Sequence, residues 1–93
     1  MYQKNAQFYV ANLGADVMRC VGATKRGDDE AYNDSLIRAR KTLSFLRELN
    51  RREAYDEGVL LLEALGYARK EKKLDAFAMQ LNVYISPLLT NIL

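Results

Sequence analysis

The chain of 93 residues contains no histidine and one cysteine, Cys20. Without histidine there is no Ser-His or Cys-His nucleophile pair, no His-containing zinc site and no Glu-x-x-His motif of di-iron bundles. A single thiol excludes an intramolecular disulfide and a zinc site built from thiolates alone. Because Cys20 falls on an apolar stripe, we interpret it as a small buried hydrophobe rather than a reactive thiol.

Two other kinds of chemical site are also poorly represented. Asp16 and Glu63 come nearest to a core carboxylate pair, but we expect each to be a solvated residue at the edge of an apolar stripe. Gly14, Gly22 and Gly27 are too widely spaced to form a phosphate-binding loop. The sequence therefore predicts a protein that is not an enzyme and uses no metal or cofactor.

Long apolar runs are scarce as well. The longest aliphatic run, residues 59–62, is far shorter than the roughly 20 residues that span a bilayer. The N-terminal residues lead into a stripe interrupted by polar side chains and not into the apolar block of a signal peptide. Fourteen basic and twelve acidic residues leave a net charge of only +2. We expect a cytoplasmic protein that does not enter the membrane.

Hydrophobic residues, by contrast, make up 49% of the chain, enough for one modest core. They recur at three- and four-residue spacing, which predicts α-helices at approximately 4–25, 29–49, 51–70 and 74–92. Short connections between amphipathic helices are typical of an up-and-down four-helix bundle. We therefore expect one all-α domain, residues 1–93, with a short C-terminal segment kinked at Pro87.

The stripes also predict the core. Helix three is apolar on most sides, so it requires neighbours on more than one face. Helix one has a second face of small residues that includes Gly14, Ala15 and Gly22, which indicates either close approach of another backbone or a locally weak helix. The expected core residues are Val10, Leu13, Val17, Cys20 or Val21 in helix one, Tyr32, Leu36, Ala39, Leu43 and Leu46 in helix two, with Ile37 and Phe45 widening that stripe, and Leu74, Phe77 and Leu81 in helix four.

Two connections carry turn signals. Gly27 fits the left-handed position after helix one, and Asp28 or Asp29 fits the N-cap of helix two. Asn50 and Glu53 have the spacing of a capping box, which favours a tight corner between helices two and three. One continuous helix through Asn50 is the alternative, although a chain of this size would leave such a helix uncovered.

Basic residues cluster at the ends of helices one and three, which an up-and-down bundle brings to the same pole. Cations at helix C-termini offset the helix dipole, and this is the structural interpretation that we favour. The alternative is a patch for an anionic partner. The residues of this basic pole are Lys25, Arg26, Arg69, Lys70, Lys72 and Lys73.

The opening MYQKNA and the block GDDEAYNDSLIRARKTLSFLREL resemble the start and second helix of bacterial flagellar export chaperones. In that family a Gly-Asp turn leads to an Asn and then to a Leu-Ile-Arg-Ala stretch. Here Gly27 and Asp28 match the turn, Asn33 the asparagine, and residues 36–39 the stretch. The resemblance covers about half the chain and implies a small helical bundle that holds an export substrate.

A four-helix monomer of this size leaves apolar surface uncovered, and such surplus commonly marks an interface. We expect a homo-oligomer, with a dimer favoured, or a chaperone- or adaptor-like protein that binds the apolar helix of a protein partner. The alternative is a small nucleic-acid-associated regulator that uses the basic pole. The predicted interface residues are Leu60, Tyr67, Leu88, Leu89, Ile92 and Leu93.

Overall fold

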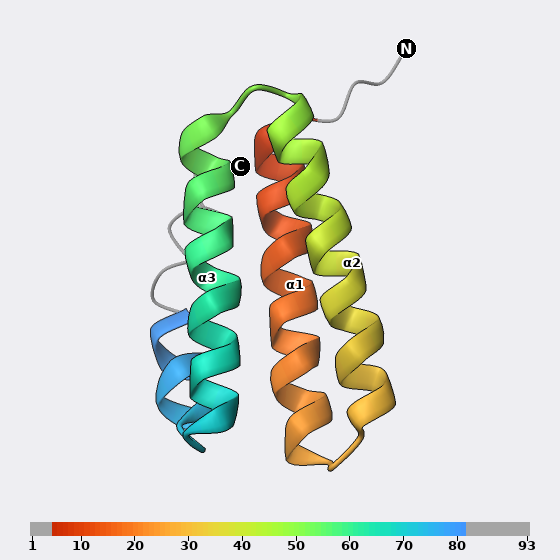
Figure 1. Cartoon of the computed structure of the whole chain (residues 1–93), viewed down its shortest axis with the longest axis vertical. Helices are drawn as coiled ribbons and strands as arrows, with labels where there is room; N and C mark the ends of the chain where they lie inside the picture. Colours follow the sequence, from red (N-terminus) through yellow and green to blue (C-terminus); the bar gives the residue numbers. More distant parts are fainter. Residues whose placement is uncertain (1–4, 82–93) are drawn as a thin grey trace.

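The computed structural model describes residues 5–81 of the chain, and these residues form an all-α bundle. Helices α1 (Ala6–Lys25), α2 (Asp29–Glu48) and α3 (Arg52–Lys70) run alternately down, up and down in Figure 1. A further helical segment, residues 74–81, lies beside the end of α3. The predicted up-and-down helical bundle is therefore confirmed. The predicted kink at Pro87 lies outside the described residues.

Each of the three helices ends in the same way, with one residue in the left-handed region of backbone space. Gly27 (φ 70°), Asn50 (φ 58°) and Lys72 (φ 58°) follow α1, α2 and α3. After α2, the amide of Arg51 donates to the carbonyl of Leu46 at 3.3 Å, the six-to-one bond of a Schellman motif. These turns satisfy carbonyls that the helix ends leave open, which makes the reversals tight.

The corner at Asn50 confirms two separate helices, but the predicted capping box is wrong. Asn50 stands after the end of α2 and does not cap α3, whose N-cap is Arg51 with no side-chain hydrogen bond. The other start is as predicted: the Asp28 carboxylate accepts from the amide of Ala31 at 3.0 Å and caps α2. Asparagine suits both an N-cap and a left-handed residue, so its identity did not separate the two roles.

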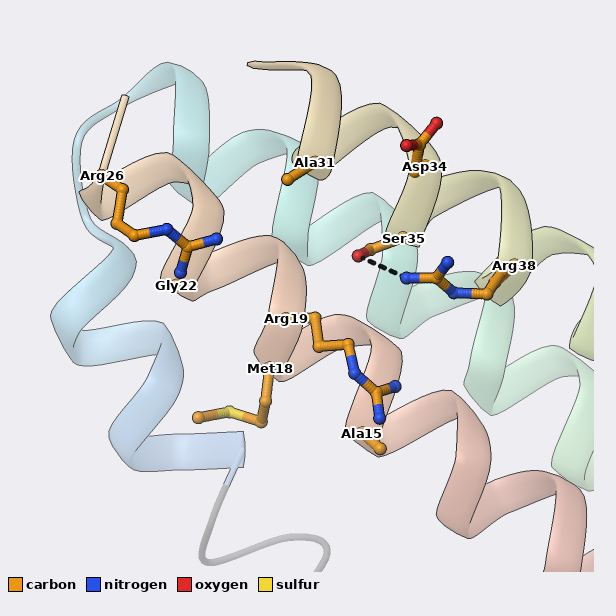
Figure 2. A pocket seen from close by; sticks show the side chains of 9 residues that line it. All are labelled: Ala15, Met18, Arg19, Gly22, Arg26, Ala31, Asp34, Ser35 and Arg38. Carbon is orange, nitrogen blue, oxygen red and sulfur yellow. Dashed lines mark hydrogen bonds between the residues drawn. The ribbon is translucent and has the colours of Figure 1, made fainter. Parts of the chain in front are cut away.

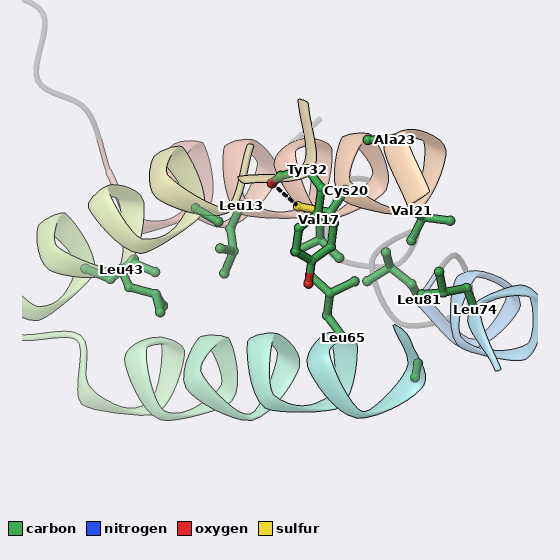
Figure 3. Close-up of a cluster of buried hydrophobic side chains, with 13 residues drawn as sticks. Leu13, Val17, Cys20, Val21, Ala23, Tyr32, Leu43, Leu65, Leu74 and Leu81 are labelled. Carbon is green, nitrogen blue, oxygen red and sulfur yellow. Dashed lines mark hydrogen bonds between the residues drawn. The ribbon is translucent and has the colours of Figure 1, made fainter. Parts of the chain in front are cut away.

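The core lies mainly between α1 and α2, whose contact is far more extensive than the contact of either with α3. Figure 3 shows Val17, Cys20, Tyr32 and Leu65 meeting at its centre. Most of the predicted stripe residues are buried here. Ile37 is 62% exposed, so the prediction that it widens the core stripe is wrong. The buried hydrophobic residues are Leu13, Val17, Cys20, Val21, Ala23, Tyr32, Ala39, Leu43, Leu46, Leu65, Ala68, Leu74 and Leu81.

Helix α3 contacts this core at a glycine, Gly58. A Cβ added to Gly58 would overlap Leu43 Cδ2 and would lie 3.0 Å from Leu13 Cδ2. The absence of a side chain therefore lets the α3 backbone lie directly on leucines of both α1 and α2. Leu65 and Ala68 follow on the same side of α3 and are buried. The opposite side of α3 faces outwards.

Candidate interaction surfaces

Three surfaces of the described residues carry features beyond packing. We name them the α1–α2 groove, the basic pole and the α3 outer face.

The α1–α2 groove consists of two adjoining cavities of about 600 and 620 Å³ on the surface between these helices. Arg19 and Arg38 border both cavities, so the two form one elongated depression. In Figure 2 these arginines lie near small side chains, and the α3 ribbon passes behind the two helices. The lining residues are Ala15, Met18, Arg19, Gly22, Arg26, Ala31, Asp34, Ser35 and Arg38 in one cavity, and Asn12, Asp16, Arg19, Arg38, Lys41, Thr42 and Phe45 in the other.

Asp16 organises the centre of this groove. Its carboxylate Oδ1 accepts from Arg19 Nη1 at 2.7 Å and lies 3.5 Å from Arg38 Nε. Arg38 Nη2 also donates to Ser35 Oγ at 3.2 Å. Asp16 is only 6% exposed, so the expectation of a solvated edge residue is wrong for it. The physical reason is the facing helix: α2 places Arg38 over the carboxylate, and a buried carboxylate is stable where cations and hydrogen bonds compensate it.

The groove unites residues that sequence reasoning did not bring together. Ala15 and Gly22 belong to the predicted small-residue face of helix one, and they line the groove together with Met18. The cations Arg19, Arg38 and Lys41, drawn from two helices, were missed. The signal that could have found them is their spacing on each helix, but it becomes informative only when the register of α1 on α2 is known.

The C-terminal ends of α1 and α3 lie at the same end of the bundle, as predicted, and they form the basic pole (Figure 1). Two of its cations are engaged by carboxylates. Lys25 Nζ lies 2.8 Å from Asp75 Oδ1, and Arg69 Nη2 lies 2.8 Å from Asp29 Oδ1. The hydrogen bond and charge of the lysine hold the pKa of Asp75 below its usual value.

Arg69 has a second partner at this pole. Its guanidinium carbon lies 3.7 Å from the centre of the Tyr32 ring, a cation–π contact that joins α3 to α2. Arg26, Lys70, Lys72 and Lys73 are exposed at the same pole. The structure thus gives Lys25 and Arg69 roles in joining helices, and binding of an anionic partner by the pole stays a prediction.

The α3 outer face carries the two predicted interface residues that lie within the described part of the chain. Leu60 is 63% exposed and Tyr67 is 60% exposed. They stand seven residues apart and so share one side of the helix. Acidic residues lie at and beside this stripe over residues 52–63 of α3: Glu53, Asp56, Glu57 and Glu63. Leu88, Leu89, Ile92 and Leu93 lie outside the described residues.

Within residues 5–81, few side chains are suited to nucleophilic chemistry or to binding a metal ion. Cys20 is fully buried, and its Sγ lies 3.6 Å from the carbonyl oxygen of Tyr32. Burial raises the pKa of this thiol, and the charge of Asp16 raises it further, while Arg38 and Arg69 act in the opposite direction. Residues 5–81 hold no cluster of three potential metal-ligating side chains. Within the same range no helix combines the length and hydrophobicity needed to cross a bilayer.

Comparison with known proteins finds no relative of this chain. No family model matches the chain, and neither a curated protein nor a solved structure matches it significantly. The resemblance to flagellar export chaperones therefore stays a prediction.

Proposed function

We propose that this chain is a non-catalytic helical-bundle protein that acts through protein–protein contact, with the α3 outer face as its contact surface. The observation that carries the proposal is the exposure of Leu60 and Tyr67, at 63% and 60%, on one side of one helix. Large apolar side chains grouped on one element, with charged residues around them, are typical of surfaces that bind another protein. Self-association and capture of a partner's apolar helix both fit this surface.

The character of the residues supports a binding role over a catalytic one. The sequence offers no histidine for acid–base chemistry. Its one thiol is buried and has a raised pKa, whereas a nucleophilic cysteine requires access and a lowered pKa. A surface that binds through packing needs neither group.

The alternative function, binding of nucleic acid at the basic pole, has weaker support. Lys25 and Arg69 already pair with Asp75 and Asp29, which lowers the positive charge that the pole offers to a phosphate backbone. The two functions differ in their response to salt. Phosphate contacts weaken steeply with rising ionic strength and respond to charge reversal at Lys70, Lys72 and Lys73, whereas apolar burial at Leu60 does not.

The α3 outer face is tested by sedimentation velocity of the chain and of Leu60→Glu over a range of concentrations. We expect the chain to form a larger species as concentration rises, and Leu60→Glu to remain smaller at every concentration, because it places a charge in the contact. Met79→Glu is the matched control, since Met79 is 71% exposed on another helical segment. Equal behaviour of all three proteins, together with no difference between them in binding a hydrophobic dye, would contradict the proposal.

A further inference from the structure

The α1–α2 groove and the α3 outer face are complementary in charge. The groove is lined by four cations and two carboxylates, a net charge of +2, and Asp16 is already engaged by two of the cations. Residues 52–63 of α3 carry four acidic residues and one arginine, a net charge of −3. Opposite potentials on two surfaces of one chain favour their contact between copies and disfavour contact of either surface with itself.

The two surfaces also agree in length. The groove follows α1 from Asn12 to Arg26, which is about 21 Å at 1.5 Å per residue. The α3 outer face runs from Glu53 to Tyr67, again about 21 Å. A straight helix of this extent therefore matches the groove in length.

The floor of the groove suits a helix in particular. Ala15 and Ala31 present little side chain, which lets the backbone of a docking helix approach closely. Gly22 has no side chain, and Arg26 lies against it (Figure 2), with Nη1 3.3 Å from where a Cβ would stand. Met18, exposed by 36%, supplies a flexible apolar contact for a leucine or an aromatic ring. Arg26 and Lys41 stand toward opposite ends of the groove and are exposed, so both are placed to meet carboxylates.

We propose that the α3 outer face of one copy docks in the α1–α2 groove of a second copy, so that self-association is head-to-tail. This inference rests on the proposed function, because it identifies the surface that covers Leu60 and Tyr67. Two different surfaces meet in such a contact, so a pair keeps a free groove on one copy and a free α3 outer face on the other, and further copies add until a ring closes or a filament grows. Four turns of helix in one groove form a contact near the lower size limit of specific interfaces, so association is concentration-dependent.

Complementary variants test this arrangement. The groove variant carries Arg26→Glu and Lys41→Glu, and the face variant carries Leu60→Glu. All three positions are exposed, and circular dichroism with a urea midpoint verifies that both variants fold. Each variant alone loses the contact, with association weakened at least about tenfold by like charges or by a buried carboxylate. Light scattering measures the mass of each variant separately and of an equimolar mixture.

The mixture gives the decisive result. The groove variant keeps an intact α3 outer face and the face variant keeps an intact groove, so a head-to-tail contact returns in the mixture and stops at two copies. If the groove variant alone associates like the unmodified chain, or if the mixture stays monomeric, the groove is not the partner surface. In that case a loss of association in Leu60→Glu alone still supports the proposed function. An unmodified chain that remains monomeric at every concentration overturns the head-to-tail contact altogether.

Discussion

At the scale of single residues, the most informative side chain is Asp16. It is buried between two helices, yet both of its arginine partners keep more than half of their side-chain surface exposed. The carboxylate thus lies inside while the cations extend from it to the surface of the groove. We interpret this arrangement as the anchor that fixes the guanidinium groups of Arg19 and Arg38 along the α1–α2 groove.

Replacing Asp16 tests this role. In Asp16→Ala the arginines lose an acceptor but can be solvated, so we expect the free energy of unfolding to fall by about 1.5–2 kcal/mol, at the low end for charged hydrogen bonds. Asp34→Ala is the control, because Asp34 lines the same groove but is exposed, and such substitutions change stability by about 0.5 kcal/mol or less. Urea unfolding measures both. Equal stabilities of the two variants would show that Asp16 is not an anchor.

Cys20 gives a prediction of pH dependence. Burial raises the pKa of its thiol above the ordinary value of 9.0, so the unfolded chain loses this proton at lower pH than the folded chain. The corresponding stabilisation is present below that value and is lost as the pH rises from there through the folded pKa. We therefore expect the free energy of unfolding to fall more steeply above about pH 9 in the natural chain than in Cys20→Ala. Parallel curves from urea unfolding across this range would contradict the assignment.

At the scale of elements, the docking of α3 depends on Gly58. The leucines that an added Cβ would meet, Leu13 and Leu43, are themselves buried. Gly66 lies two turns further along the same helix, and a Cβ there would meet nothing within 4 Å. The two glycines therefore form a natural pair for separating packing from helix propensity.

The expected effects of alanine at these positions have opposite signs. Gly66→Ala gains helix propensity and raises the free energy of unfolding by about 1 kcal/mol. Gly58→Ala gains the same propensity but overpacks the contact at a cost of about 1–3 kcal/mol, so we expect a net destabilisation of up to about 2 kcal/mol. Urea unfolding of the two variants measures the difference. Equal stabilisation by both substitutions would mean that α3 does not lie against the leucines as described.

The elements show which features the sequence could predict. The helices and most of the core followed from local spacing, because an amphipathic stripe needs only its own residues to be recognised. Asn50 was misassigned because the same side chain suits two different ends of a helix. Burial of Asp16, exposure of Ile37 and the grouping of Arg19 with Arg38 depend on how α2 lies on α1. That register is set by contacts between residues far apart in the chain, which a local pattern does not contain.

At the scale of the whole molecule, the described surface has two complementary parts on different elements. The acidic, apolar α3 outer face and the cationic α1–α2 groove lie on separate sides of the bundle, since the α3 ribbon passes behind the groove in Figure 2. A chain with such surfaces can form one contact through each of them. The basic pole lies at one end of the bundle and holds elements together through Lys25 and Arg69.

The central claim is that the α3 outer face is the contact surface. Amide chemical shifts of ¹⁵N-labelled protein during dilution test this claim most directly. We expect concentration-dependent shifts at residues 53–67 and, where the groove is the partner surface, at Ala15, Gly22 and Ala31. Amides of the core around Val17 should change little, because that packing is the same in every copy. Shifts that are absent from 53–67 while other surfaces respond to dilution would contradict the account.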